Sequence, residues 1–595
     1  NTMSLMALIV ATGFVVDDAI VVLENISRHI EEGMSPLRAA LKGAREVGFT
    51  VLSMSLSLIA VFIPILLMGD IVGRLFREFA VTLSAAILVS LVVSLTLTPM
   101  MCARLLKTPE QTRQPGRVSR ALGRFFDALL RGYDRSLAWA LKHSLLTVVV
   151  LALTVGLDVY LYVKVPKGFF PQQDTGQLMG FVRADQGTSF QAMGPKLEYF
   201  RKVVLSDPAV ESMVGYSGGR AGSNSSFLVI QLKPITQRKE KIAQVIARLR
   251  MRLSNIAGAQ MFMVPNQDIR IGGRSSRSSY QYTLMASELS ALREWMPKVQ
   301  QALLKMPELA DVDTDIEDKG QQISLQIDRE TATRLGVDMS TIAAVLNNSF
   351  TQRQVSVIYN TLNQYRVVME VDQRYAQNAD ALSKVFVITA AGTRVPLSAF
   401  AKWQTTNAPL SVQHDSQFVA DTISFNLAPG VSLGQATAAI EQAIARISLP
   451  TTEIQAGFAG SAKALQSTLS AQPWLILAAL VTMYLVLGIL YESYIHPLTI
   501  LSTLPSAGIG ALLALMVLGK EFTLIALIGV FLLIGIVKKN AIMMVDFALD
   551  AERRLGLSPR EAIYQACLVR FRPILMTTMA AMLGALPLVL GTGAG

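Results

Sequence analysis

The chain has 595 residues, of which 51% are apolar and 16% are charged, and its formal net charge is +11. The charged fraction is higher than a chain made only of membrane spans would hold, so we expect a membrane protein with a large water-facing part. Because the positive charge gathers in segments that flank apolar runs, it indicates membrane topology and disfavours a nucleic-acid partner.

Eight stretches of about 20 residues are apolar enough to cross a bilayer as helices. The predicted spans are 2–23, 48–69, 79–103, 143–163, 473–491, 493–519, 522–545 and 573–595. The fourth span contains Asp158 near its end, and we interpret this residue as interfacial. The sequence therefore predicts an α-helical polytopic membrane protein with lipid around its spans.

The first predicted span carries two adjacent acids, Asp17 and Asp18, and no other charge. An ionised side chain at mid-membrane costs at least about 2.5 kcal/mol, so a pair implies partners, a shared proton or a water-filled path. Repulsion and desolvation both favour the neutral acid. The pair predicts a site that takes up and releases protons, with purely structural capping or pairing as the alternative.

Lysine and arginine positions predict the orientation of the spans. Residues 101–142 are rich in lysine and arginine and residues 548–572 are rich in arginine, which indicates the cytoplasmic side. Counting spans then places 164–472 on the opposite side of the membrane. Both cysteines, Cys102 and Cys567, lie at cytoplasmic ends of spans, so the exported region can hold no disulfide and no cysteine zinc site.

The exported region reads as mixed α/β, with two strand-helix-strand modules. Helical spacing at 190–204 precedes strands at 227–232 and 261–264, and the order repeats with strands at 280–285 and 322–327. Strand and turn patterns over 354–400 suggest an inserted subdomain. In the glycine- and serine-rich loop 216–226 and beside it, Met213, Tyr216 and Phe227 are candidates to line a substrate cleft, and each is equally a candidate for the core.

Partners for the acids occur in the last two predicted spans. Lys538 and Lys539 interrupt an apolar run and are followed by Asn540, while Arg570 and Thr577 open the final run. Together with the acids they predict a buried ionic cluster. No ATPase motif occurs and the four histidines have no metal spacing, so we expect no cofactor, no metal and an ion gradient as the energy source.

An internal repeat relates the two ends of the chain. A shift of 522 residues sets Asp17 on Lys539 and Glu24 on Asp546, and with one extra residue Pro36 falls on Pro559. Parallel repeats in transporters place coupling sites where the halves meet. Since the chain begins with Asn1 and ends directly after an apolar run, we expect it to be an internal fragment of a duplicated protein, truncated at both ends.

Four stretches resemble resistance-nodulation-division (RND) multidrug efflux pumps of the hydrophobe and amphiphile type, and among them the Mdt-type subunits, B or C. These stretches are 13–25, 166–171, 539–542 and 572–577. The resemblance implies that the proton-relay positions are Asp17, Asp18, Lys539, Arg570 and Thr577. Lys538 and Asn540 are relay neighbours of open role, because the doubled lysine departs from family members that have one.

The same resemblance implies the domain organisation. Residues 1–103 would be spans 4–6 of twelve, 104–142 a cytoplasmic basic loop or helix, 143–163 span 7, and 473–595 spans 8–11. Residues 164–472 would be periplasmic, with ferredoxin-like porter modules and a docking insertion at about 351–405. The expected location is the bacterial inner membrane.

The function implied is proton-driven export of amphiphilic small molecules by a secondary transporter, not an enzyme. Its partners would be RND subunits in a homo- or hetero-trimer, a periplasmic adaptor and an outer-membrane channel. A metal-ion exporter of the same architecture is the first alternative, disfavoured because the exported region lacks cysteine and a clustered methionine or histidine site. A non-conducting, substrate-binding subunit of a mixed trimer is the second.

Overall fold

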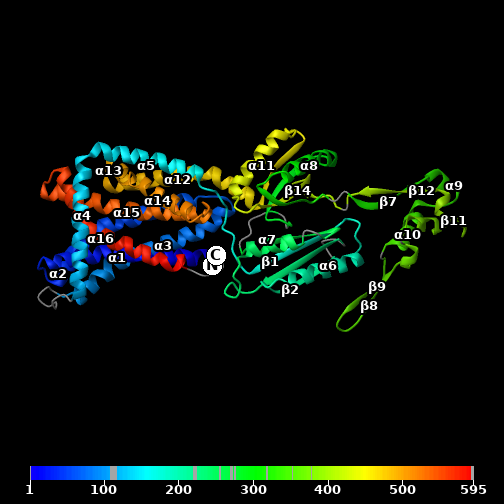
Figure 1. Cartoon of the computed structure of the whole chain (residues 1–595), viewed down its shortest axis with the longest axis horizontal. Helices are drawn as coiled ribbons and strands as arrows, with labels where there is room; N and C mark the ends of the chain where they lie inside the picture. Colours follow the sequence, from blue (N-terminus) through cyan, green and yellow to red (C-terminus); the bar gives the residue numbers. More distant parts are fainter. Residues whose placement is uncertain are drawn as a thin grey trace.

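A computed structural model describes residues 2–107, 117–218, 224–253, 256–268, 273, 276–316, 319–351, 353–376, 378–409 and 411–590. Along its longest axis the molecule consists of a helix bundle, then two α/β modules side by side, then a smaller inserted subdomain farthest from the bundle (Figure 1). The predicted fold class, a polytopic membrane protein with a large α/β domain, is confirmed.

Eight spans, counted over the described residues, are long and apolar enough to cross a membrane. Seven are single helices and one is the pair α13 and α14. Their bounds are α1 (Thr2–Glu31), α2 (Pro36–Leu66), α3 (Asp70–Leu105), α5 (Ser144–Lys164), α12 (Gly460–Tyr491), α13 (Ile495–Leu501), α14 (Leu504–Val517), α15 (Leu524–Leu555) and α16 (Pro559–Val589).

Helices α1, α2, α3, α15 and α16 extend beyond the predicted apolar spans at one or both ends, and two further spans differ in other ways. Helix α12 begins at Gly460, well before the predicted start at Pro473, because the helix continues out of the bundle to the second module. The predicted span 493–519 is divided into α13 and α14. Pro505 lies in the first turn of α14, where its missing N–H costs nothing, so the chain restarts a helix there.

Helix α4 (Arg117–Lys142) lies across the end of the bundle that is farthest from the modules (Figure 1). It exposes Arg131 and Arg135 to solvent, and Trp139 is 56% exposed. Its Tyr133 ring stacks on Phe571 of α16 at a centroid distance of 4.5 Å. A basic amphipathic helix in this place suits the surface of a membrane, and its charge indicates the cytoplasmic surface.

The first module has four antiparallel strands in the order β2-β3-β1-β4 and two helices, which is the ferredoxin-like arrangement. The two central strands, β3 and β1, alternate in burial because one face of the sheet packs on the helices. Its elements are β1 (Gln177–Ala184), α6 (Phe190–Leu205), β2 (Val210–Ser217), β3 (Ser225–Leu232), α7 (Ile242–Leu253) and β4 (Ala259–Pro265).

The second module repeats this order, with strand β5 between β14 and β15, and β6 on the outer side of β14. The long β14 is almost wholly buried. Its elements are β5 (Tyr280–Ala286), α8 (Leu289–Leu304), β6 (Leu309–Thr314), β13 (His414–Asp415), β14 (Phe418–Leu427), α11 (Leu433–Ile447) and β15 (Ile454–Ala459).

The insertion begins earlier than the sequence indicated. The predicted strand 322–327 is β7, but it pairs only with β12, and β6 takes the expected place in the module. Strands β7 and β12 form a ribbon that carries the inserted elements, so the excursion covers 320–408. The elements are β7 (Gly320–Ile327), α9 (Arg329–Arg334), α10 (Met339–Phe350), β8 (Arg353–Tyr359), β9 (Gln364–Met369), η3 (Gln373–Tyr375), η4 (Ala379–Lys384), β10 (Phe386–Ile388), β11 (Arg394–Pro396), η5 (Leu397–Ala399) and β12 (Ala401–Ala408).

Apolar packing joins the second module to the bundle. One continuous cluster contains Leu284 and Phe425 of this module, Leu465 of α12 and Phe531 of α15. The first module and the insertion have separate clusters. Gly460, at a φ of +59°, makes the sharp connection from β15 to α12 that a side chain would strain. The second module is therefore built onto the bundle through α12.

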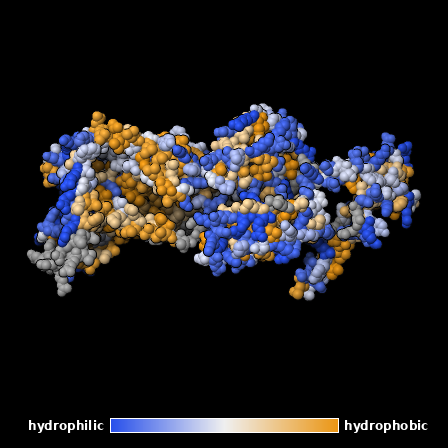
Figure 2. Space-filling view, in the orientation of Figure 1, coloured by the Kyte–Doolittle hydropathy of each residue, from blue (hydrophilic) through white to orange (hydrophobic). Residues whose placement is uncertain are grey.

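Surface hydropathy separates the two halves of the molecule. Orange, hydrophobic side chains dominate the bundle, whereas blue, hydrophilic ones dominate the modules (Figure 2). Exposed apolar residues such as Val148, Leu153 and Ile489 cover the bundle. A surface of this kind is stable in lipid and not in water.

The position of α4 and the hydropathy give a topology prediction. A cysteine introduced at Ser290, which is exposed on α8, should react with an impermeant thiol reagent in intact cells, and one at Ser136 on α4 should react only after the inner membrane is opened. Both native cysteines of the chain are buried, and the parent protein gives the background. Labelling of Ser136→Cys but not Ser290→Cys in intact cells would reverse the orientation.

A second prediction concerns the first module. Arg248 on α7 donates from Nε and Nη2 to Asp207 at 2.8 Å. Burial alone would raise the pKa of Asp207, but the hydrogen bonds from Arg248 and the Ala209 N–H hold that pKa below its usual value. The pair's contribution to stability is thus complete above the unfolded pKa and is lost as pH falls through the lower folded pKa.

Asp207→Asn should therefore destabilise the module by about 3 kcal/mol, the cost of breaking a buried pair. Hydrogen exchange in α6 and α7 of the intact protein measures the loss, which should be seen at pH 7 and should shrink in strong acid. Equal exchange in the variant and the parent at pH 7 would contradict the assignment. Glu198→Gln, which removes an exposed partner of Arg201, is the control.

Candidate functional site

The two acids and one lysine meet in the middle of the bundle. Asp17 and Asp18 on α1 are each 3% exposed, and Lys539 on α15 is 5% exposed. Lys539 Nζ lies 2.6 Å from Asp18 Oδ1 and 3.7 Å from Asp17 Oδ2. Lys539 thus bridges both carboxyls, as the repeat register predicts.

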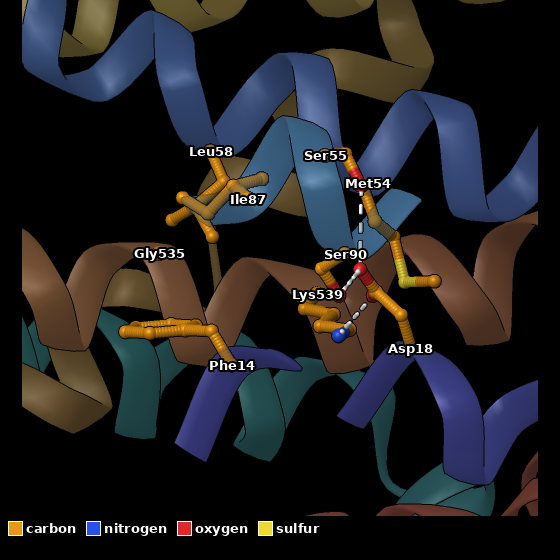
Figure 3. Close-up of a pocket in the computed structure, with 9 residues that line it drawn as sticks. All are labelled: Phe14, Asp18, Met54, Ser55, Leu58, Ile87, Ser90, Gly535 and Lys539. Carbon is orange, nitrogen blue, oxygen red and sulfur yellow. Dashed lines mark hydrogen bonds and ion pairs between the residues drawn. The ribbon is translucent and has the colours of Figure 1, made fainter. Parts of the chain in front are cut away.

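Two serines complete the surroundings of Asp18. Its Oδ2 lies 3.3 Å from Ser90 Oγ on α3 and 3.5 Å from Ser55 Oγ on α2. Figure 3 shows both hydroxyls directed at the carboxylate, with Lys539 on its other oxygen. Sequence reasoning missed these serines, because each stands in an apolar run with nothing to distinguish it from a helix-packing residue.

The space around Asp18 and Lys539 is small, whereas a mostly apolar cavity of about 180 Å³ borders Asp17. A cavity of about 10 Å³ lies beside Asp18 and Lys539, with Phe14, Leu58 and Ile87 among its walls. Such a volume holds about one water molecule. Because so little water screens the charges, the lysine is balanced by one carboxylate, and a second ionised carboxylate would be an uncompensated buried charge. The site can therefore bind a proton on a carboxylate, and the ion pair with Lys539 is then lost.

Lys538 does not share this site. It is 1% exposed, and its Nζ has no hydrogen-bond partner in the described part of the chain. Consecutive residues of an α-helix point about 100° apart, so Lys538 and Lys539 face different neighbours. Asn540 is half-buried, and no hydrogen bond to the acids is found for it among the described residues.

Arg570 and Thr577 are buried on α16 but are not bonded to the acid pair. Arg570 Nη1 lies 3.6 Å from Glu24 Oε2, and its guanidinium lies 4.9 Å from the ring centre of Phe547. The Thr577 hydroxyl donates to the Ile574 carbonyl of its own helix at 3.0 Å. The structure thus groups Arg570 with Glu24, nearer to α4, and not with Asp17 and Asp18.

Of the three candidate cleft residues in the first module, Tyr216 and Phe227 are neighbours on adjacent strands, whereas Met213 packs against the module core. Met213 pairs with Ile230 across the sheet and packs against the module core. Tyr216 is 64% exposed, and its ring lies 5.8 Å from that of Phe227. Residues 219–223 of the adjoining loop lie outside the described residues.

A much larger cavity lies elsewhere, between both modules and the helix ends. Its volume is about 830 Å³, and its walls include Phe169, Phe170, Arg250, Tyr280, Glu521 and Ile525. Burial raises the pKa of the Glu521 carboxyl and raises that of Tyr280 to about 12. Mixed aromatic, cationic and acidic walls suit a molecule with apolar and polar parts.

Comparison with known proteins gives a match over the full chain. The model of the AcrB/AcrD/AcrF family matches residues 1–595. The chain is 60% identical over 595 residues to proteins named Multidrug resistance protein MdtC from Yersinia enterocolitica (serotype O:8 / biotype 1B), Yersinia pseudotuberculosis (serotype O:3) and Yersinia pestis (bv. Antiqua, strain Angola). Each match covers 100% of this chain and 58% of the relative.

The ion pair gives a prediction for stability that is independent of any function. Lys539→Ala leaves two acids without their cation and should lower the melting temperature of the detergent-solubilised protein, and adding Asp18→Asn should restore part of it. A coupling of about 3 kcal/mol is typical of a buried pair. Lys538→Ala should show no coupling to Asp18→Asn. Additive effects for Lys539 and Asp18 would contradict the contact.

Proposed function

The chain belongs to the AcrB/AcrD/AcrF family of RND proteins, and on that basis we propose that it forms part of an inner-membrane exporter of amphiphilic small molecules that is driven by protons. The observation that carries the proposal is the bridge from Lys539 to Asp17 and Asp18 in the centre of the bundle. Burying this ion pair in the membrane costs desolvation free energy, and ionisable residues inside membrane spans are functional by default.

Family membership confirms the resemblance drawn from the motifs, and the chain is a multi-pass protein of the inner membrane with its large domain on the periplasmic side. The chain spans 58% of the length of the relatives it matches, so activity, substrates and partners are proposed for the protein that contains it. It would act as a secondary transporter without a cofactor and not as an enzyme.

In the proposed cycle the ion pair between Lys539 and Asp18 is broken and re-formed. With Asp18 ionised, Lys539 is held between α1 and α15; when a proton neutralises the carboxyl, the attraction is lost and the two helices shift. One proton that moves down roughly 100 mV and about one pH unit yields about 2.3 plus about 1.4 kcal/mol. That supports a substrate gradient of roughly several hundredfold per proton.

A mechanical path from the site to the modules supports the proposal. Helix α12 runs without a break from β15 into the bundle, and α2 packs along it. The second module moves with α12, whereas the first module has its own core. A shift of the bundle would therefore change the cavity between the modules, which is the alternating access that export needs.

The same cavity is the proposed entry for the substrate. Phe169 and Phe170, in the segment after α5, and Glu521, in the link between α14 and α15, line it. The cavity therefore lies at the level of the helix ends that face the modules. An amphiphile in the outer leaflet could reach it without crossing the bilayer. The relatives are named multidrug resistance proteins, which agrees with an amphiphilic substrate class.

The hairpin of β8 and β9 is the proposed contact with a partner subunit. Among the described strands these two pair only with each other, and Leu362 at the hairpin tip is 94% exposed, with Tyr359 72% and Ile358 56% exposed. An isolated hairpin is marginal in water, and exposed apolar residues in a group indicate an interface. We expect it to insert into a neighbouring subunit of a trimer, with an adaptor and an outer-membrane channel beyond.

Asp18→Asn tests the function. The substitution keeps the size of the side chain but fixes it as neutral, so proton-dependent efflux of a fluorescent amphiphile should fall at least about a hundredfold, within the range that a positioned proton carrier contributes. Protein abundance should stay near the parent level. Glu552→Gln, which removes an exposed carboxylate of α15, should leave efflux unchanged.

Full efflux in Asp18→Asn at matched abundance would contradict proton coupling. That result would favour the alternative in which the chain is a ligand-binding subunit that conducts no protons. Loss of resistance to metal ions alone, with drug efflux absent in the parent as well, would favour the metal exporter.

A further inference from the structure

A second charged cluster repeats the spacing of the central site. Glu24 follows Asp17 by seven residues on α1, and Asp546 follows Lys539 by seven on α15. Seven residues are almost two turns of helix, about 10 Å along the axis, so each acid lies on the same face as the central residue of its helix. Glu24 and Asp546 are also equivalent positions of the internal repeat.

Arg570 of α16 lies between the elements that carry these acids. Its charge interacts with both Glu24 and Asp546, and the side chain is 7% exposed. Its Nε and Nη1 have no hydrogen-bond partner within the described chain, and the ion pair to Glu24 is long at 3.6 Å. The guanidinium is therefore held by charge and by the Phe547 ring and is not locked by a fork of hydrogen bonds.

This cluster is at the cytoplasmic end of the bundle. Phe571, the residue after Arg570, stacks on Tyr133 of the basic helix α4. Other charged groups surround the two acids on every helix packed there. They are Arg28 and Glu31 on α1, Glu46 on α2, Asp550 and Arg553 on α15, and Arg572 on α16.

Hydroxyl groups on α2 lie beside both the central site and the second cluster. Ser55 Oγ lies 3.5 Å from Asp18, and the Thr50 hydroxyl donates to the Asp546 carboxylate. Ser53 lies between them in sequence and is fully buried, and its hydroxyl has no hydrogen-bond partner among the described residues. Ser53 is three residues from Thr50 and lies on the same side of α2, whereas Ser55 points about 160° away from Ser53, so α2 presents hydroxyls to the two clusters from different sides.

We propose that Glu24 and Asp546, arranged around Arg570, form the station that releases protons to the cytoplasm. A proton leaves the neutral carboxyl of Asp18, passes through intervening water to the side of α2 that carries Ser53 and Thr50, and binds the carboxylate of Asp546. The neutral acid then gives the proton to water at the cytoplasmic end, directly or through Glu24. Arg570 stays charged throughout and stabilises whichever carboxylate is ionised. The inference rests on the proposed function.

Three variants test the station in proteoliposomes under an imposed proton gradient. Asp546→Asn, Glu24→Gln and Ser53→Ala each keep side-chain size close to the parent, and each single acid variant leaves Arg570 one carboxylate. Asp546→Asn should slow proton-coupled transport at least about tenfold, since a positioned proton carrier contributes more than that. Ser53→Ala and Glu24→Gln should slow it less. Glu552→Gln, an exposed acid of α15, and Ser57→Ala, a buried serine bonded to the Met54 carbonyl of its own helix, should match the parent.

A small soluble proton carrier distinguishes a proton-relay role of Glu24 and Asp546 from a purely structural role. Imidazole on the cytoplasmic face should restore transport in Asp546→Asn and Glu24→Gln, because it can accept the stranded proton, whereas it cannot re-form the ion pair lost in Asp18→Asn. The parent in the same buffer corrects for any effect on the gradient. The rate should depend on imidazole concentration in the two acid variants only.

Parent rates in all three variants, with Asp18→Asn inactive, would overturn the station and leave the proposed function standing. A loss that imidazole does not restore would also overturn it, since a structural role predicts that result. Activity in Asp18→Asn would instead remove the proposed function itself.

Discussion

The ion pair between Lys539 and the two aspartates is the constraint on which the rest of the bundle depends. Charges this deep are stable only when they compensate one another or are hydrated, and little water reaches Asp18 and Lys539. The close packing of α1, α2, α3 and α15 around Asp18 therefore leaves the charges to compensate one another, with two serine hydroxyls as the remaining partners. A change of one proton alters this balance, and the helices that carry the charges must respond.

The response can reach the modules because the second module shares its apolar cluster with the bundle. A single helix, α12, joins a membrane span to the edge of a sheet, and we therefore propose that the two parts move as one body. The first module lacks that connection, and the large cavity lies between the two. We propose that this difference in how the two modules are attached to the bundle converts a movement of the membrane helices into opening and closing of the cavity between the modules.

Much of this arrangement can be predicted from sequence, because isolated charges in apolar runs are conspicuous. Asp17, Asp18 and Lys539 are found in that way, and the repeat register brings them together. Arg570 could not be placed, since which neighbour a helical residue meets depends on the rotation of packed helices. Strand 322–327 has the right alternation for a module strand, but alternation does not specify the pairing partner, and it pairs with β12. Met213 is similar, since one residue of register decides whether a side chain faces the core or the open face.

The central claim is that the bond between Lys539 and the aspartates is made and broken during the cycle. Structures of the intact protein in its several conformations, determined at the pH of each side of the membrane, measure this directly. The account predicts at least one conformation in which Lys539 Nζ is within hydrogen-bond distance of Asp18, as here at 2.6 Å, and another in which that contact is lost while α1 and α15 have shifted. The same contact in every conformation, at every pH, would contradict it.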